Sequence, residues 1–215
     1  MTTYAIPRPP VPAVPVQGSD QVFPVRRIYC VGRNYAAHRA EMGGDDRDPP
    51  FFFSKPADAV VPPGEDVPYP PATANLHHEI ELVVAIDEGG TIFGYAAGVD
   101  LTRRDLQAKA KDKGQPWDAA KGFDASAPVS AIRRGGESPR GRIRLSVNGE
   151  VRQDALVSDM LWNVDEIIAE AGKLWKLEAG DLIFTGTPEG VGALKQGDAV
   201  EGEVEGVGKL SFKVV

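Results

Sequence analysis

The chain has 215 residues, a formal net charge of -7 at pH 7 and 42% hydrophobic residues. This length predicts one domain with a substantial core, and the negative charge with scattered lysines and arginines argues against nucleic acid as the main partner. A single cysteine, Cys30, excludes an intrachain disulfide, and no apolar stretch approaches the roughly 18 residues that span a bilayer. We therefore expect a cytoplasmic protein that acts on a small molecule rather than on nucleic acid or a membrane.

The N-terminal segment, residues 1–24, is rich in proline and valine and contains no repeat. Such a composition predicts an extended arm that lies on the surface or on a partner subunit. Residues 25–215 are predicted to form a single domain, which contains all the candidate site residues.

The first half of this domain is predicted to mix short strands with one helix. Strands are expected at 25–31 and 51–53, the second of them buried, and a helix at 34–42 that stops at two consecutive glycines. Five prolines within 62–71 exclude a regular helix or a central strand there. This stretch is therefore expected to be an ordered, irregular crossing.

The second half is predicted to be mainly strands. An Asn148-Gly149 turn between apolar strands is the strongest hairpin signal in the chain. Helices are expected at 103–113 and 163–175. The expected strands are 76–86, 92–99, 143–147, from 151 onward, 182–185, 199–204 and 210–215. Many short strands with few helices predict an α+β, mainly β fold such as a barrel or rolled sheet.

The predicted strand at 76–86 carries two carboxylates, Glu79 and Glu81. Residues two apart in a strand point to the same face, so these side chains should lie side by side while Ile80 and Leu82 face the other way. Oxygen ligands of this kind suit Mg²⁺, Mn²⁺ or Ca²⁺. The alternative is a half-buried strand whose polar face meets water.

Asp100 and Lys121 are two further candidate functional residues. Asp100 ends the apolar run 92–99 and could add a third carboxylate, although an aspartate there could also cap a helix. Lys121 lies among small and aromatic residues; in a cleft it could neutralise charge on a substrate oxygen, and otherwise it is an ordinary exposed lysine.

His38 and Glu41 are three residues apart in the predicted helix and therefore share a face. A carboxylate beside an imidazole fixes its tautomer and raises its basicity, which suits a histidine that takes a proton from water. The alternative is an ordinary surface pair.

Residues 184–192 form a glycine-rich loop after a predicted strand and could present N–H groups to an anion. The loop lacks the Gly-Lys-Ser/Thr ending of a phosphate-binding loop, and the chain has no Gly-x-Ser-x-Gly motif. Nucleotide binding and a serine nucleophile are therefore disfavoured.

Four segments together resemble the fumarylacetoacetate hydrolase family: residues 29–38, 78–81, 94–105 and 185–188. They occur in family order, and the resemblance runs from about residue 25 to the C-terminus. It implies a mixed β-sandwich roll of the family's C-terminal domain type, generally dimeric, which binds Mg²⁺ or Mn²⁺.

The resemblance also assigns roles to residues at matching positions. The metal ligands are Glu79, Glu81 and Asp100. The catalytic residues are the water-activating pair His38 and Glu41 and the active-site lysine, Lys121. Weaker candidates for substrate contact are Arg33, Gln107 and Thr187.

Within the family, the short length and residues 76–78 and 117–123 look most like the members that hydrolyse fumarylpyruvate in gentisate breakdown. The implied reaction is metal-dependent cleavage of the C–C bond of a 2,4-diketo acid, giving fumarate and pyruvate. Related members are other acylpyruvate hydrolases, oxaloacetate decarboxylases and isomerases. A ligand-binding protein without activity is disfavoured because His38 and Glu41 are both present.

Overall fold

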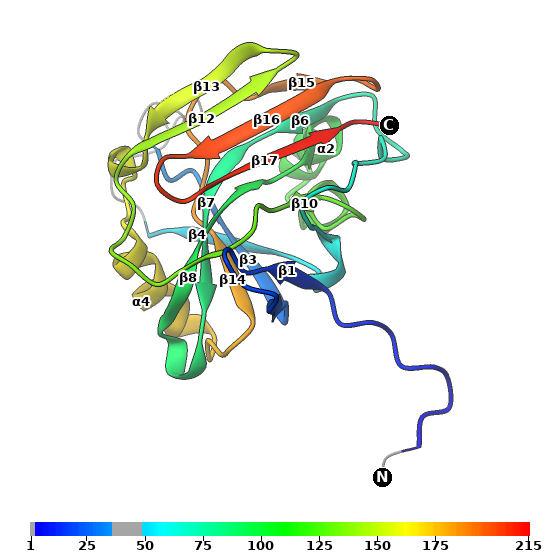
Figure 1. Ribbon diagram of the computed structural model, residues 1–215. Coiled ribbons are helices and arrows are strands. Elements are labelled where there is room, and N and C mark those ends of the chain that lie inside the picture. The colour runs from blue at the N-terminus through cyan, green and yellow to red at the C-terminus, as the bar shows by residue number, and fades with distance from the viewer. Residues whose placement is uncertain (1–2, 36–48) are drawn as a thin grey trace.

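The structure is a computed structural model that describes residues 3–35 and 49–215 (Figure 1). Its largest sheet has six strands. In spatial order these are β11 (Arg133–Arg134), β8 (Ile92–Val99), β7 (Ile80–Ile86), β14 (Asp181–Phe184), β3 (Arg27–Gly32) and β4 (Phe51–Lys55). Only the β14–β3 pairing is parallel within this described sheet.

A four-stranded antiparallel sheet crosses above the first sheet (Figure 1). Its strands are β13 (Glu150–Leu156), β12 (Arg142–Val147), β16 (Ala199–Val204) and β17 (Gly208–Lys213). Alternate residues of β12 and β16 are buried, and they pack on Leu82 and Val84 of β7 in the main hydrophobic core. The molecule is therefore a sandwich in which an apolar face of each sheet packs against the other sheet.

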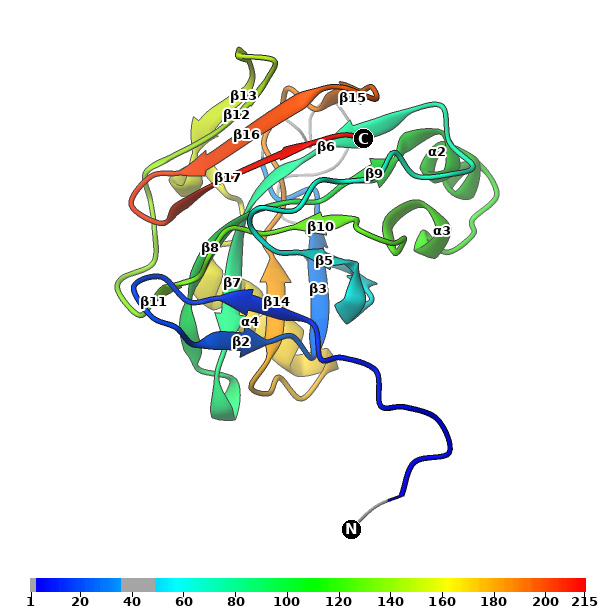
Figure 2. The same ribbon diagram turned by 45° about the vertical axis from the view of Figure 1, so that its right-hand side comes forward.

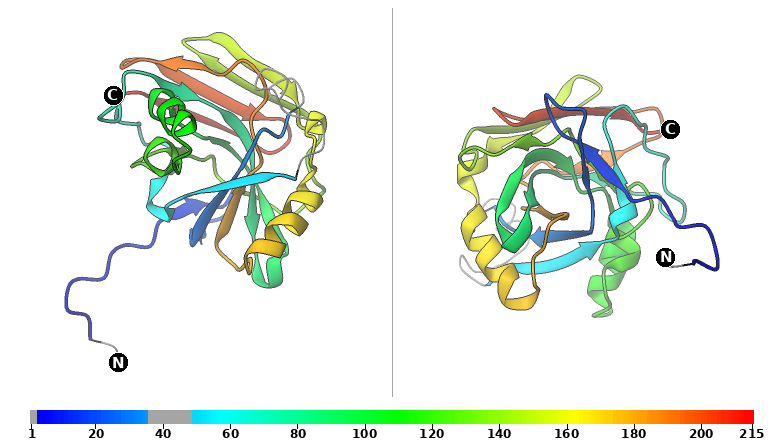
Figure 3. Two further views of the ribbon diagram at one scale, coloured as in Figure 1. Left: turned by 180° about the vertical axis from the view of Figure 1, so that it is seen from behind. Right: turned by 60° about the horizontal axis from the view of Figure 1, so that its bottom comes forward.

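Smaller sheets and helices complete the roll (Figures 2 and 3). The small sheets pair β1 (Ala13–Pro15) with β2 (Val22–Pro24), β10 (Ala127–Pro128) with β5 (Val60–Val61), and β6 (Leu76–His78) with β9 (Thr102–Arg103) and β15 (Gly192–Leu194). In the described part of the chain the α-helices are α2 (Arg104–Asp112), α3 (Asp118–Lys121) and α4 (Val164–Leu174), and the 3₁₀ turns are η1 (Ala57–Ala59), η2 (Glu88–Gly90) and η3 (Val157–Asp159). Among the described helices, none is long and apolar enough to cross a membrane.

The β1–β2 hairpin covers the face of the six-stranded sheet that is opposite α4 (Figure 2). Val14 and Phe23 are buried there in a second, smaller core with Val83 and Ala85 of β7. Residues 3–10 are exposed and extend away from the body of the protein (Figure 1). The proline-rich segment thus includes a packed hairpin as well as an exposed stretch.

Most predicted elements are confirmed. The Asn148-Gly149 turn joins β12 to β13, with φ of 53° and 79° at these two residues, as a tight hairpin turn requires. Asn163 caps α4 by accepting a hydrogen bond from the N–H of Glu166. The region 62–71 contains no helix and no strand of its own. The mainly β, α+β fold follows the sequence pattern.

Three expectations need correction or lie outside the described residues. The predicted strand 76–86 is interrupted at Glu79, which separates β6 from β7. Phe51 begins a strand as predicted, but its side chain is 42% exposed rather than buried. The predicted helix 34–42 lies outside the described residues from residue 36 onward.

Candidate metal centre and active site

Three buried carboxylates meet where β7 begins and β8 ends. Ile80 pairs with Val99 in the antiparallel register, so Glu79 and Asp100 lie opposite each other, and the Asp100 N–H donates to the Glu79 carbonyl at 2.8 Å. Each of Glu79, Glu81 and Asp100 is at most 5% exposed, and a carboxylate oxygen from each lies within 4.8 Å of the other two. The structure thus brings the three predicted ligands together, and their burial argues against a water-facing strand and a simple helix cap.

The surroundings of Glu81 differ from those of its two neighbours. Among the described residues its carboxylate has no cationic partner and accepts one hydrogen bond, from the Gly186 N–H at 2.7 Å. Burial, reinforced by the charges of Asp100 and Glu79, raises the pKa of Glu81 well above its usual value. A cation between the carboxylates would relieve this repulsion.

The donor set fits a hard divalent cation. Carboxylate oxygens are the preferred protein ligands of Mg²⁺ and Mn²⁺, whereas zinc favours nitrogen and sulfur. Glu79, Glu81 and Asp100 supply three such oxygens from a rigid strand pair, and the rest of the coordination would be left to water or substrate oxygens.

Lys121 lies against the triad of Glu79, Glu81 and Asp100 and is only 2% exposed, so it is not an ordinary surface lysine. It is the last residue of α3, a single helical turn. Its Nζ donates to Glu79 Oε2 at 2.8 Å, Asp100 Oδ2 at 2.6 Å and Thr102 Oγ1 at 2.7 Å. Burial lowers the pKa of Lys121, but the charges of Asp100 and Glu79 raise it by more, so the net pKa is raised. The side chain is therefore an ammonium ion.

Two further cations at the site were not predicted. Lys55, at the end of β4, is 3% exposed; its Nζ lies 2.9 Å from Asp100 Oδ1 and donates to the carbonyl of Leu101 at 3.1 Å. Arg104, the first residue of α2, forms an ion pair with Glu79. A lysine that ends an aromatic strand, directly before Pro56, is a weak sequence signal, because nothing local to it indicates Asp100 as its partner.

The three weaker candidates, Arg33, Gln107 and Thr187, all line one small cavity beside Glu79 and Glu81. The cavity measures about 20 Å³, room for one water or ion. Arg33 adopts a left-handed φ of 62°, which is uncommon for a residue other than glycine. Gln107 accepts a hydrogen bond from Arg104 at 2.7 Å. The structure thus places all three near the triad.

A larger hollow of about 240 Å³ adjoins this cavity through shared lining residues, Gly32, Arg33 and Trp117. Phe51 and Trp162 complete much of its apolar wall. Together the two spaces present cationic and hydrogen-bonding groups at the triad and aromatic groups further out. This arrangement suits a small organic acid.

The predicted catalytic pair, His38 and Glu41, lies outside the described residues. Its role stays a prediction from the resemblance.

The two histidines before Glu79 are described. Burial lowers the pKa of both: that of His77 falls to about 4, and His78 hydrogen-bonds Gln153. Both imidazoles are therefore neutral near pH 7.

The backbone of the glycine-rich loop, residues 184–192, binds Glu81, a carboxylate of the protein itself. Gly186, with φ of 96°, donates its N–H to Glu81, and the Thr185 hydroxyl donates to the Leu82 carbonyl at 2.9 Å. A residue with a side chain at position 186 would be strained by this φ and would crowd Asn34. The loop thus holds the Glu81 carboxylate in place and positions Thr187 in the wall of the cavity.

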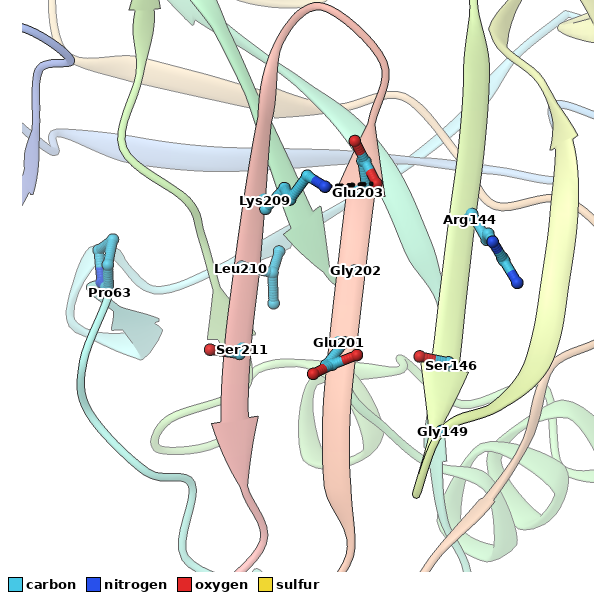
Figure 4. A pocket seen from close by; sticks show the side chains of 10 residues that line it. All are labelled: Pro63, Arg144, Ser146, Gly149, Glu201, Gly202, Glu203, Lys209, Leu210 and Ser211. Atoms are coloured by element: carbon cyan, nitrogen blue, oxygen red, sulfur yellow. Dashed lines mark ion pairs between the residues drawn. The ribbon is translucent and has the colours of Figure 1, made fainter.

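A separate groove of about 540 Å³ lies on the outer face of the four-stranded sheet (Figure 4). Glu203 and Lys209 form an ion pair at 3.1 Å there, with Arg144 and Glu201 nearby (Figure 4). These side chains are exposed or half-buried. The groove therefore lacks the buried, closely spaced carboxylates of the cavity at Glu79.

Comparison with known proteins agrees with this site. Residues 27–215 match the fumarylacetoacetate (FAA) hydrolase C-terminal family, and the chain belongs to that family. The predicted family, its fold and the prediction of an enzyme are thereby confirmed.

Three relatives stand out. A fumarylpyruvate hydrolase of a Ralstonia species is 46% identical, over 76% of this chain and 92% of its own length. The mitochondrial oxaloacetate tautomerase FAHD1 of Rattus norvegicus is 43% identical, over 88% of this chain and 91% of its own. The crystal structure of fumarylpyruvate hydrolase from Pseudomonas aeruginosa in complex with Mn²⁺ and pyruvate superimposes with a TM-score of 0.96 at 45% identity, covering 99% of both chains.

Proposed function

We propose that this protein is a metal-dependent hydrolase that cleaves the C–C bond of fumarylpyruvate, a 2,4-diketo acid, to give fumarate and pyruvate, as in gentisate breakdown. The observation that carries the proposal is the buried triad Glu79, Glu81 and Asp100 beside a cavity lined by cations. Support comes from the similar structure that was crystallised with Mn²⁺ and pyruvate, one of the two products.

The metal is proposed to be Mg²⁺ or Mn²⁺, held by the three carboxylates. When bound, it would supply Lewis acidity that stabilises negative charge on the oxygens of an α-keto acid.

The described side chains have separate tasks in this proposal. The Lys121 ammonium, held by Glu79 and Asp100, stabilises the oxyanion that develops at the attacked carbonyl. Arg33, Gln107 and Thr187 bind the substrate from the other walls of the cavity. The aromatic wall of the adjoining hollow holds the carbon chain of the acyl group.

Water activation is assigned to His38 and Glu41. His38, oriented by Glu41, takes a proton from the water that attacks the C4 carbonyl. The C3–C4 bond then breaks, its electron pair passes to the pyruvate part as an enolate, and protonation at C3 completes pyruvate. General base catalysis of this kind contributes about 10²–10⁴ in rate.

A direct test uses purified protein, stripped of metal and then supplied with Mg²⁺ or Mn²⁺, with fumarylpyruvate, maleylpyruvate and acetylpyruvate as separate substrates. We expect metal-dependent release of pyruvate, fastest from fumarylpyruvate. Asp100→Asn should abolish it. Asp181→Asn is the matched control, because Asp181 is also a fully buried carboxylate but pairs with Arg26, at 2.9 Å, rather than with the triad. Equal turnover with and without metal would refute the proposal.

A second candidate function is action on oxaloacetate, favoured by the similarity to an oxaloacetate tautomerase. The same site would stabilise an enolate without attack by water. Following the ultraviolet absorbance of enol-oxaloacetate reports tautomerisation, and release of carbon dioxide reports decarboxylation. Oxaloacetate turnover in the absence of any diketo acid hydrolysis would replace the first proposal by this one.

The homodimer and the cytoplasmic location stay predictions, and the proposal includes both Mg²⁺ and Mn²⁺. Size-exclusion chromatography with light scattering tests the homodimer. Titration of each metal in the activity assay determines which of the two supports turnover better.

A further inference from the structure

Gln153 is a buried amide in a strand that otherwise faces solvent. It is 1% exposed, and it is the one fully buried residue of β13. The β12–β13 register shifts between Leu145 and Ser146, which leaves Arg152 as the extra residue of a bulge directly before Gln153. Bulges re-aim side chains, and this one is placed to turn the amide inward.

The loop that carries Thr187 lies against the same bulge. Gly190 has φ of 89°, and any side chain there would collide with the Arg152 carbonyl. This close approach brings the segment 187–190 within reach of the Gln153 side chain.

Four hydrogen bonds fix which way the Gln153 amide points. Its Oε1 accepts from the Ile80 N–H at 3.1 Å and bonds His78 Nδ1 at 2.9 Å. Its Nε2 donates to Thr187 Oγ1 at 2.8 Å and to the Pro188 carbonyl at 3.0 Å. A backbone N–H can only donate and a carbonyl can only accept, so the reversed amide is excluded and His78 carries its proton on Nδ1.

This arrangement sets the direction of the Thr187 hydroxyl. The oxygen accepts from Gln153, so its own hydrogen must point elsewhere. Among the described residues the hydroxyl donates to none, and Thr187 lines the cavity beside Glu79 and Glu81. The hydrogen is therefore available to an acceptor in that cavity.

We propose that Gln153 is a positioning residue that holds the Thr187 hydroxyl as a hydrogen-bond donor toward a carboxylate or keto oxygen of the substrate. The inference rests on the proposed function only for the identity of that substrate, an α-keto acid. Gln153 itself is not among the residues that line the cavity.

The test is a double-mutant cycle of Gln153→Glu and Thr187→Val. A glutamate keeps the acceptor for Ile80 but loses the donor to Thr187, and its carboxylate attracts the hydroxyl hydrogen away from the cavity. We expect each variant to raise KM for fumarylpyruvate roughly 10- to 100-fold, the loss of one hydrogen bond to a charged group. In the Thr187→Val background, Gln153→Glu should raise KM by less than about a further twofold, because the hydroxyl that Gln153 positions is already gone.

A binding measurement separates this inference from the proposed function. Isothermal titration of pyruvate into the Mn²⁺-loaded protein should show that each single variant raises the Kd and that the two increases are not additive in free energy. This result is expected whether or not fumarylpyruvate is turned over. Thr187→Ser keeps the hydroxyl, so in the Thr187→Ser background Gln153→Glu should again weaken pyruvate binding as it does in the wild type. Gln17→Glu is the control, since Gln17 Nε2 also donates two hydrogen bonds, here to the carbonyls of Ala131 and Val207, but Gln17 lies away from the cavity.

Two results would overturn the inference. One is a double variant whose increase in KM or Kd equals the product of the two single increases, which would indicate a role of Gln153 independent of Thr187. The other is a Thr187→Val protein that binds pyruvate as the wild type does; this variant is nearly isosteric, so the result decides the matter even if Gln153→Glu fails to fold.

Discussion

The two faces of strands β7 and β8 bury different kinds of side chain. On one face Ile80, Leu82 and Ile86 pack into the main core between the sheets. On the other face Glu79 and Glu81 lie at one end, while Val83 and Ala85 lie under the β1–β2 hairpin at the other.

The apolar face stabilises the fold because its side chains are removed from water. Burial of the carboxylates costs desolvation free energy, which only their hydrogen bonds and ion pairs offset. The first face therefore holds the structure and the second holds a reactive site, and variants on each should behave in opposite ways.

The largest expected effect is on metal binding. Glu81→Gln removes one charge of the triad but keeps an oxygen for the Gly186 N–H. We expect metal affinity, measured by isothermal titration with Mn²⁺, to fall by at least about 100-fold and turnover to be lost. Unchanged affinity would show that Glu81 is not a ligand.

The same variant should be more stable than the wild type when no metal is present. Removing a buried charge that has no cationic partner among residues 3–35 and 49–215 relieves repulsion by Glu79 and Asp100. Differential scanning calorimetry of the metal-free proteins is expected to show a higher Tm for Glu81→Gln, and Mn²⁺ is expected to raise only the wild-type Tm. A lower Tm for the metal-free variant would contradict the comparison of the two faces.

Truncation on the apolar face should do the reverse. Ile86 is fully buried in the main core at the end of β7 away from the triad. Ile86→Ala is expected to lower the free energy of unfolding by about 2–5 kcal/mol, seen in urea titrations, while the folded protein binds Mn²⁺ as the wild type does. Weaker metal binding by the folded variant would mean that the faces are not independent.

The pH dependence of stability sharpens the contrast. The folded-state pKa of Glu81 is raised above 4.5, so its contribution favours folding below that pH and is lost as the pH rises through the folded-state pKa. Urea unfolding of the metal-free proteins should therefore show the advantage of Glu81→Gln growing as the pH rises from 4.5 toward neutral. Parallel pH profiles for the two proteins would refute this.

The smallest effect is expected in the groove on the outer sheet. Glu203→Gln breaks an ion pair with Lys209 whose members are 47% and 74% exposed. Surface pairs contribute about 0.2–1 kcal/mol, so stability should change by no more than that and turnover not at all. A large loss of activity would give the groove a function.

Several features of the site were predictable because they depend on neighbours in the sequence. Glu79 and Glu81 share a face because strand residues alternate, and the Asn148-Gly149 turn follows from the φ that asparagine and glycine tolerate. The order of the motifs indicated the family. These properties need no knowledge of what lies across the fold.

Two cationic partners of the triad, Lys55 and Arg104, and the buried amide of Gln153 were not predictable. Lys55 reaches Asp100 from 45 positions away, and Gln153 reaches the Ile80 N–H from 73. A lysine after an aromatic strand and a glutamine in a polar strand look like surface residues, because sequence periodicity says which face a residue occupies but not what covers that face.

The sequence by itself determined the strands, the tight turn and the three acids that can gather at the end of one strand pair, since these follow from backbone geometry over a few residues. Only the tertiary structure decided that Glu79 interrupts its strand, that Lys55, Lys121 and Arg104 surround the acids, and that Glu81 alone of the three lacks a described cationic partner. The strength of buried charges depends on distance and solvent exclusion, and both are set by chain segments that meet only when the two sheets pack.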